Sequence, residues 1–313
     1  MSAPATAAPP TSAGGSAPRE PRRRHRNTYG WPARAFSLPA VLLVAVLLYL
    51  PFLWTTWISL TEYNGLGSPE WVGLDNYRAM FDDANFLTSL RNTLIWVVGT
   101  ITVPVALGLL IAMLSHGLRF GAWLRLPFLI PYAISGVAVG IVWVVVLQNG
   151  GALSQALDAL GLPGGDTRWL LDAPMNTVVM IGAAAWQQTG VNALLFVIGL
   201  QSIPREPIEA ARLDGASGWR MFRHMYWPML RPLTTVVVGL GLVASLKTFD
   251  IVWIMTKGGP GRNSETLAVT MYEETFVNSA YGSGSAVAVF LSAVTFLAAI
   301  TYLRRQLSTE RTV

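Results

Sequence analysis

The chain has 313 residues, of which 52% are hydrophobic and only 12% are charged. Soluble domains carry roughly 25% charged residues, so this composition argues against an ordinary soluble protein. The net charge of +5 accompanies long apolar runs, and membrane orientation therefore explains it better than nucleic-acid binding. The absence of cysteine excludes disulfides and thiolate chemistry.

Long stretches without Asp, Glu, Lys or Arg determine the class of protein. Five of them are at least as long as the roughly 20 residues that a helix needs to cross a bilayer. A sixth, near 232–256, is interrupted only by Lys247 and Asp250. Helices of a soluble core are the alternative, which so many runs in one chain disfavour. We predict an all-α integral membrane protein with six transmembrane helices, near 38–60, 88–114, 126–147, 175–201, 232–256 and 281–303.

The basic residues predict which ends of these helices lie inside the cell. If the N-terminus is inside, 16 of the 22 Arg and Lys lie in inside segments and five lie in outside segments. Arg and Lys accumulate in cytoplasmic loops. We therefore expect a multi-pass protein of a bacterial cell membrane with both termini in the cytoplasm. The loop 203–228 would then also be cytoplasmic.

The N-terminal segment differs in composition from the rest. Residues 1–37 are rich in Ala, Pro, Ser and Gly and turn basic at 22–26, so we expect a disordered cytoplasmic tail. The long apolar run 38–60, with no small-residue cleavage site, disfavours a signal peptide. The basic run is interpreted as a topology anchor, with binding to anionic lipid as a second possibility. The membrane domain would cover 38–305, followed by a cytoplasmic tail, 306–313.

Two further local features follow in chain order. Pro127 and Pro131 should distort the start of the third membrane helix, because proline lacks the backbone N–H and clashes with the preceding turn. The outer loop 148–174 has leucines at helical spacing, which predicts a short amphipathic helix.

The loop 203–228 is polar although apolar runs flank it, so it must lie at a membrane surface. Pro204 and Pro207 suit the start of a helix. Glu206 and Glu209 fall in its first turn, which the helix dipole favours. Gly215 is suited to a left-handed turn that would end this helix.

A second short helix is expected after that turn. Ser217 could cap it, and Pro228 would stop it. Ala210 and Ala211 keep one face of the first helix small, so another protein could approach closely. An amphipathic connector that lies on the membrane without a partner is the alternative interpretation.

The spacing in this loop resembles a known family. Glu-Ala-Ala at 209–211, then Gly215 and a hydrophobic pair ending at Pro228, is similar to the EAA loop of ABC importer permeases. Met225 and Trp227 depart from the Ile and Leu that the family prefers. Further segments resemble the carbohydrate-uptake branch, which includes the maltose and glycerol-3-phosphate permeases: WVGLDNY at 71–77, RLPFLIPY at 125–132, and TFDIVWIMTKGGP at 248–260 followed by Glu265, Thr266 and Tyr272.

This resemblance implies a type I ABC importer permease fold with a cytoplasmic coupling-helix loop. It also implies partners: an ATP-binding subunit dimer that carries ATP and Mg, a second homologous permease, an extracytoplasmic (lipoprotein) solute-binding protein, and a sugar. No cofactor is expected on this chain. The large outer domain of the maltose channel subunit is absent. The residues expected to couple to the ATPase are Glu206, Glu209, Ala210, Ala211, Asp214, Gly215, Trp219 and Phe222.

A second set of residues is expected to line the solute pathway. Lys247 and Asp250 are ionisable groups within a span, which usually face a bundle interior or a water-filled path. Their i, i+3 spacing on one helix would let them pair, and a structural ion pair is the alternative role. The polar and aromatic candidates to contact a sugar are Trp186, Gln187, Gln188, Asn192 and Trp253, with contacts between membrane helices as the alternative role of the amides.

Enzyme chemistry is not predicted. Neither lysine, Lys247 nor Lys257, stands in the Gly-Lys-Ser/Thr pattern of a phosphate-binding loop. The histidines His25, His116 and His224 lack metal-ligand spacing. ATP hydrolysis would therefore belong to a partner. An ion-coupled secondary transporter, with Asp250 as its buried carboxylate, remains an alternative. An ABC permease for a non-sugar solute such as glycerol-3-phosphate is another.

Overall fold

The computed structural model describes residues 31–310, and the chain divides into two compact units, Met1–Pro51 and Phe52–Val313. Of the expected tail, residues 1–30 lie outside the described residues. In the first unit, α1 (Trp31–Val44) begins earlier than the expected start at 38 and continues into a π-helical turn, η1 (Ala45–Tyr49). Helix α2 (Leu50–Ile58) follows, and most of it belongs to the second unit.

Six helices in the described part of the chain are long and apolar enough to cross a membrane. This agrees with the number predicted from the charge-free runs. Their bounds are Ala35–Ile58, Ala84–Ser115, Gly136–Ala159, Met175–Gln201, Gly218–Leu246 and Tyr281–Tyr302.

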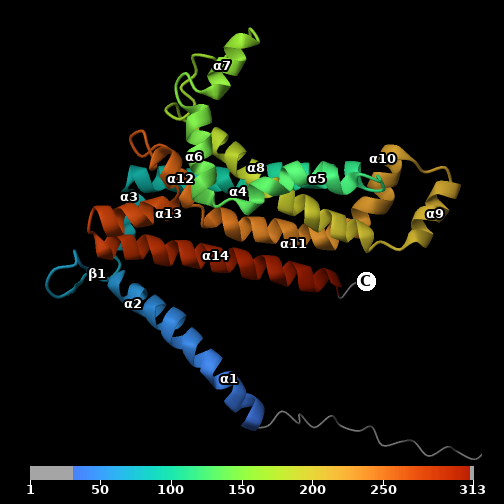
Figure 1. Cartoon of the computed structure of the whole chain (residues 1–313). Coiled ribbons are helices and arrows are strands. Elements are labelled where there is room, and N and C mark those ends of the chain that lie inside the picture. Colours follow the sequence, from blue (N-terminus) through green and yellow to red (C-terminus); the bar gives the residue numbers. More distant parts are fainter. Residues whose placement is uncertain (1–30, 311–313) are drawn as a thin grey trace, which may run out of the picture. The chain divides into compact units, whose positions relative to one another are not determined.

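Four long helices form the centre of the second unit. They are α4 (Ala84–Ser115), α8 (Met175–Gln201), α11 (Trp227–Leu246) and α14 (Tyr281–Glu310). Helix α4 packs along α8, α11 contacts both, and α14 packs against α11 (Figure 1). Glycines allow the closest approaches, since a side chain on Gly108 would collide with the backbone of α8 at Asn192 and Ala193.

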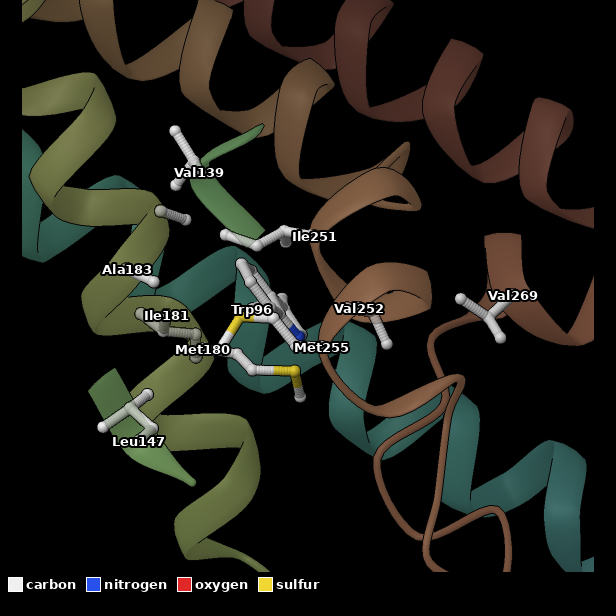
Figure 2. Packing of buried hydrophobic residues seen from close by; sticks show 11 residues of the cluster. Trp96, Val139, Leu147, Met180, Ile181, Ala183, Ile251, Val252, Met255 and Val269 are labelled. Carbon is white, nitrogen blue, oxygen red and sulfur yellow. The ribbon is translucent and has the colours of Figure 1, made fainter. Parts of the chain in front are cut away.

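The largest buried cluster joins helices that are distant in sequence. Trp96 of α4, Met180 of α8 and Val139 of α6 (Gly136–Leu147) lie against Ile251 and neighbouring residues of α12 (Asp250–Thr256), as Figure 2 shows. Val269 of the helix 267–272 also belongs to this cluster. The cluster therefore fixes the two short helices, α6 and α12, against the two long ones.

Two spans expected as continuous helices are broken. The third was expected at 126–147, but α5 (Gly121–Leu129) and a 3₁₀ turn, η2 (Ile130–Ala133), end before α6 begins. The fifth was expected at 232–256, but α11 ends at Leu246 and α12 begins only at Asp250. Prolines explain the first break, because Pro131 lies in the 3₁₀ turn. Apolar composition alone could not reveal the second.

Several short elements accompany the long helices of the second unit. Strands β1 (Thr61–Glu62) and β2 (Glu70–Trp71) pair antiparallel with Thr61 opposite Trp71, a small exception to the all-helical expectation. The predicted amphipathic helix is present as α7 (Ala152–Ala159). The other short elements are α3 (Asp75–Asp82), α13 (Leu267–Tyr272) and a π-helical turn, η4 (Glu273–Val277). Figure 1 shows α3, α12 and α13 at the opposite end from α9 (Arg205–Leu213) and α10 (Gly218–Met221).

Gly190 of α8 provides a test of this packing. A Cβ atom there would collide with the Phe128 carbonyl group of α5, whereas a Cβ at Gly182 of the same helix would meet nothing within 4 Å. We expect Gly190→Ala to lower the free energy of unfolding by about 1–3 kcal/mol through overpacking. Gly182→Ala should be neutral or stabilise by up to about 1 kcal/mol. Thermal unfolding in detergent measures both, and equal melting temperatures would contradict this account.

Candidate functional site

The two helix breaks border the same cavity. Its volume is about 180 Å³, and its lining includes Gly136 beside the first break and Lys247, Thr248 and Phe249 of the second. The remaining residues of the lining are Trp96, Ala184, Gln187, Gln188, Asp250 and Ile251. A polar cavity thus lies where two membrane spans are interrupted.

Side chains satisfy the backbone carbonyls that the breaks release. Gln187 Nε2 donates to the carbonyl oxygen of Ile134 at 2.7 Å. Thr266 Oγ1 donates to the carbonyl oxygen of Thr248 at 2.8 Å. Non-helical backbone at membrane depth is tolerated only where it is buried in protein or lines a cavity. Gln187 therefore supports the break in the third span, while Thr266 supports the break in the fifth.

Three polar side chains in this cavity remain available. The side chains of Gln188, Lys247 and Asp250 make no hydrogen bond or ion pair with any residue that the structure describes. The alternative role considered for Lys247 and Asp250, an ion pair on one helix face, is wrong, because Lys247 follows the last residue of α11 and Asp250 begins α12. The break separates the two charges and leaves both exposed to the cavity.

The other candidates for the solute pathway do not line this cavity. Trp186 packs edge-on against Trp143, with ring centroids 5.9 Å apart. Asn192 is only 8% exposed and lies at the close approach of α4 and α8. Trp253 belongs to an aromatic group with Phe249 and Tyr272 beside α12. Of the seven residues predicted, the structure brings together Gln187, Gln188, Lys247 and Asp250.

A buried polar network anchors the segment that supports the second break. Glu265 is 1% exposed and accepts hydrogen bonds from Arg262 Nε at 2.6 Å and from Thr270 Oγ1 at 2.8 Å. Asn92 Nδ2 of α4 donates to the Glu265 carbonyl oxygen at 3.0 Å. The next residue is Thr266. The network therefore holds in place the hydroxyl that satisfies Thr248. Sequence reasoning noted Glu265 and Thr266 only as a family pattern and missed this role.

The same network perturbs the titration of its members. The hydrogen bond to Glu265 keeps the pKa of the Arg262 guanidinium above its ordinary value, although burial opposes it. Glu274 also accepts a hydrogen bond from Arg262, at 3.2 Å. Burial raises the pKa of the Glu273 carboxyl above its ordinary value, and the charge of Glu265 adds to that shift. Arg262 thus forms ion pairs with two of the three neighbouring carboxylates, Glu265 and Glu274.

The loop 203–228 lies at the other end of the second unit (Figure 1). Helix α9 ends where predicted, with Gly215 in a left-handed conformation at φ +81°. The Gly215 amide donates to the Arg212 carbonyl at 3.0 Å, and the Ala216 amide donates to the Ala211 carbonyl at 2.9 Å. These two bonds form a Schellman motif, which only glycine adopts at no steric cost.

The second half of this loop differs from the prediction. Ser217 makes no capping hydrogen bond, so it is not the cap that was expected. Pro228 does not stop the helix, because α10 continues through a π-helical turn, η3 (Phe222–Tyr226), directly into α11. Pro228 is the second residue of α11 and follows the π-helical turn, where the helical hydrogen-bond pattern is already altered. The second half of the loop, from Gly218, is therefore helically continuous with the fifth span.

The residues expected to meet an ATPase divide into two groups. Ala211 and Phe222 pack against the buried cluster that contains Ile208 and Met221. The other candidates are exposed, and the same loop exposes two large apolar side chains, Leu213 at 90% and Trp219 at 69%. The exposed candidates are Glu206, Glu209, Ala210, Asp214, Gly215 and Trp219.

Comparisons with known proteins identify the family. A model described as the binding-protein-dependent transport system inner membrane component matches residues 104–308. The chain belongs to this family. It is therefore a multi-pass permease subunit of the inner membrane, which lacks an ATPase domain, and the ion-coupled carrier considered from the sequence does not apply.

Individual relatives agree with this assignment. A probable ABC transporter permease of Pyrococcus horikoshii is 34% identical over 86% of this chain and 93% of its own length. The sn-glycerol-3-phosphate transport system permease of Agrobacterium fabrum is 34% identical over 82% of this chain and 88% of its own length. The fold matches a solved bacterial ABC transporter involved in importing the acidic polysaccharide alginate, with a TM-score of 0.78 and 19% identity over 88% of this chain and 95% of that chain.

The two adjacent glutamines of the permease have separable roles. Gln187→Leu should lower the free energy of unfolding by about 1–3 kcal/mol, because the Ile134 carbonyl would lose its donor. Gln188→Leu is the matched control and should change stability by less than about 0.5 kcal/mol. Melting temperatures of the purified variants in one detergent measure the difference. Equal destabilisation would show that Gln187 does not support the break.

Proposed function

We propose that this permease forms one half of the pore of an ATP-driven carbohydrate importer. The observation that carries the proposal is the cavity at the two helix breaks, where Gln188, Lys247 and Asp250 have no partner within the described chain. Ionisable and amide side chains are costly in a membrane span unless they face water or a polar ligand. A passing solute is such a ligand.

The chemistry of the lining fits a polyhydroxylated solute. The Gln188 amide and the Asp250 carboxylate offer a donor and acceptors to hydroxyl groups, and Lys247 offers a further donor. The ring of Phe249 adds an apolar face beside them. The relative from Agrobacterium is named for glycerol-3-phosphate, which has two hydroxyl groups, and the solved transporter is named for the polysaccharide alginate. These names support a carbohydrate or a related polyol.

The small volume of the cavity supports a solute site that is shared between two permease subunits. At about 180 Å³ it is smaller than the roughly 300–1,000 Å³ typical of small-molecule pockets. A second homologous permease, facing this one, would supply the remaining wall. An extracytoplasmic binding protein, lipid-anchored in many bacteria, would deliver the solute.

The opposite end of the bundle is suited to an ATPase dimer that carries the ATP and Mg. The excess of Arg and Lys predicts that loop 203–228 faces the cytoplasm. Its first helix, α9, is exposed and ends in the rigid turn at Gly215. We propose that Glu206, Glu209, Ala210, Ala211, Asp214, Gly215, Trp219 and Phe222 form the coupling surface.

Helical continuity provides a path from that surface to the cavity. The chain runs without a break from α10 through η3 into α11, whose 20 residues span about 30 Å. Helix α11 ends at Leu246, next to Lys247 in the cavity lining. When ATP closes the ATPase dimer, movement of the loop would be transmitted along α11 to the helix break. The pore would open outward, and hydrolysis would reset it.

A non-sugar solute is the second candidate, and a specific observation favours it. Lys247 lies in the cavity lining without an ion-pair partner in the described chain. An unpaired ammonium group suits an anionic solute such as glycerol-3-phosphate. Asp250 in the same lining favours neutral hydroxyl groups instead, so we rank a carbohydrate first.

Gly215→Val tests the coupling role. A branched side chain at φ +81° would strain the turn and displace α9, so uptake should fall to background and the ATPase should co-purify less. Gly161→Val is the matched control, because Gly161 has φ +66° and equal free space but lies in the loop after α7. Immunoblots of membranes verify equal insertion. Wild-type uptake by Gly215→Val would refute coupling through this loop.

Gln188→Ala and Asp250→Asn test the pathway. The complete transporter, with its binding protein and ATPase, would be reconstituted and offered labelled maltose, trehalose or glycerol-3-phosphate. Each variant should lower uptake of the transported solute roughly tenfold, since one hydrogen bond to it is lost. Gln148→Ala, at an exposed position outside this cavity, is the control. Unchanged uptake in both variants would show that the solute passes elsewhere.

A further inference from the structure

A second cavity lies on the inner side of helix α9. Its volume is about 400 Å³, and it is enclosed by α9, by the ends of α4 and α8, and by Tyr226 of η3. His116 directly follows the last residue of α4, and Gln201 is the last residue of α8. The cavity is therefore level with the ends of two membrane spans, where lipid headgroups lie.

The charged groups of this cavity are mostly basic. Arg205 and Arg212 lie on the same face of α9 as the buried Ile208, and both line the cavity. Neither arginine forms an ion pair within the described chain. Glu209 is the single carboxylate of the lining, and His116 adds a titratable group. With two arginines and one carboxylate, the charge of the lining favours an anionic ligand.

A largely buried tyrosine gives an independent indication of a ligand. Tyr226 is 9% exposed, and its ring packs edge-on against His116 with centroids 6.0 Å apart. Its hydroxyl group has no hydrogen-bond partner among residues 31–310, although the residue lines the cavity. The polar atoms of largely buried side chains usually have a hydrogen-bond partner. An acceptor inside the cavity would satisfy this donor.

The start of α9 offers further donors. Pro204 precedes the helix and provides no side-chain cap for the first amide groups. Pro204 and Arg205 both line the cavity. Uncapped amides at a helix start attract anions, and phosphate groups bind readily there. Two guanidinium groups, a phenol and these amides thus converge on one space.

We propose that this cavity binds the phosphate group of an anionic phospholipid from the membrane leaflet at this end of the spans. Phosphate esters match the paired arginines, and basic pockets between membrane helices are known to bind lipid headgroups. Leu200 and Ile208 form an apolar part of the lining, which suits the glycerol and the first acyl carbons better than a free phosphate. The lipid would wedge between α9 and the span ends and set the position of the loop.

Lipid titration of the purified chain tests this site without requiring transport. The detergent-solubilised protein would be titrated with phosphatidylglycerol or phosphatidylcholine, and binding followed by native mass spectrometry. The variant pair Arg205→Gln and Arg212→Gln should weaken phosphatidylglycerol binding by about fivefold for each arginine. Tyr226→Phe should weaken it several-fold while leaving the fold intact. Arg220→Gln with Arg223→Gln, exposed on the same loop but outside the lining, should bind like the wild type.

Three outcomes would overturn the proposal. Equal phosphatidylglycerol binding by the wild type and the Arg205/Arg212 variant would remove the site. Soluble glycerol phosphate that binds the same residues as tightly would assign the cavity to a free phosphate ester. Release of the lipid on adding the ATPase subunit would assign it to the protein interface. The proposal takes its cytoplasmic setting from the proposed function, but a failure here would leave the uptake experiments unaffected.

Discussion

Every backbone polar group that leaves a helix inside a membrane must find a partner within the protein. The two breaks in this chain depend on that constraint. The Ile134 carbonyl is satisfied by Gln187 and the Thr248 carbonyl by Thr266. Because these partners come from α8 and from the segment before α13, the breaks exist only in the assembled bundle. The cavity between them is a consequence of the same hydrogen bonds.

The ion pair of Arg262 with Glu265 supports the second of these two helix breaks. Glu265 is almost fully buried and accepts from Arg262 and Thr270, so removal of one partner would leave a costly unpaired charge. Its main-chain neighbour Thr266 holds the second break. The polar network at one end of the bundle therefore determines the geometry of a cavity deeper in the span. At the other end, helix continuity links the loop after α8 to the same cavity through α11.

Polar residues in the spans of this permease have different roles that their spacing does not reveal. Gln187 and Gln188 are adjacent, yet one is engaged with a backbone carbonyl and the other is free in the cavity. Asn192, one turn further, is buried between two helices. Helix α8 thus supplies an amide that supports the backbone, Gln187, an amide that is free to bind a ligand, Gln188, and a residue that packs between helices, Asn192. The direction of each side chain around the helix axis decides which role it takes.

The sequence by itself determined the membrane class, the number of spans, helix α9 and its glycine turn, since these depend on local composition and on backbone freedom at one residue. Only the tertiary structure decided where the third and fifth spans break, because the partners of the released carbonyls lie far away in sequence. The separation of Lys247 from Asp250 was also decided by the tertiary structure, because the two residues would share one face of an unbroken helix. The same applies to Tyr226, whose free hydroxyl group matters only because α9 folds back over it and encloses a cavity.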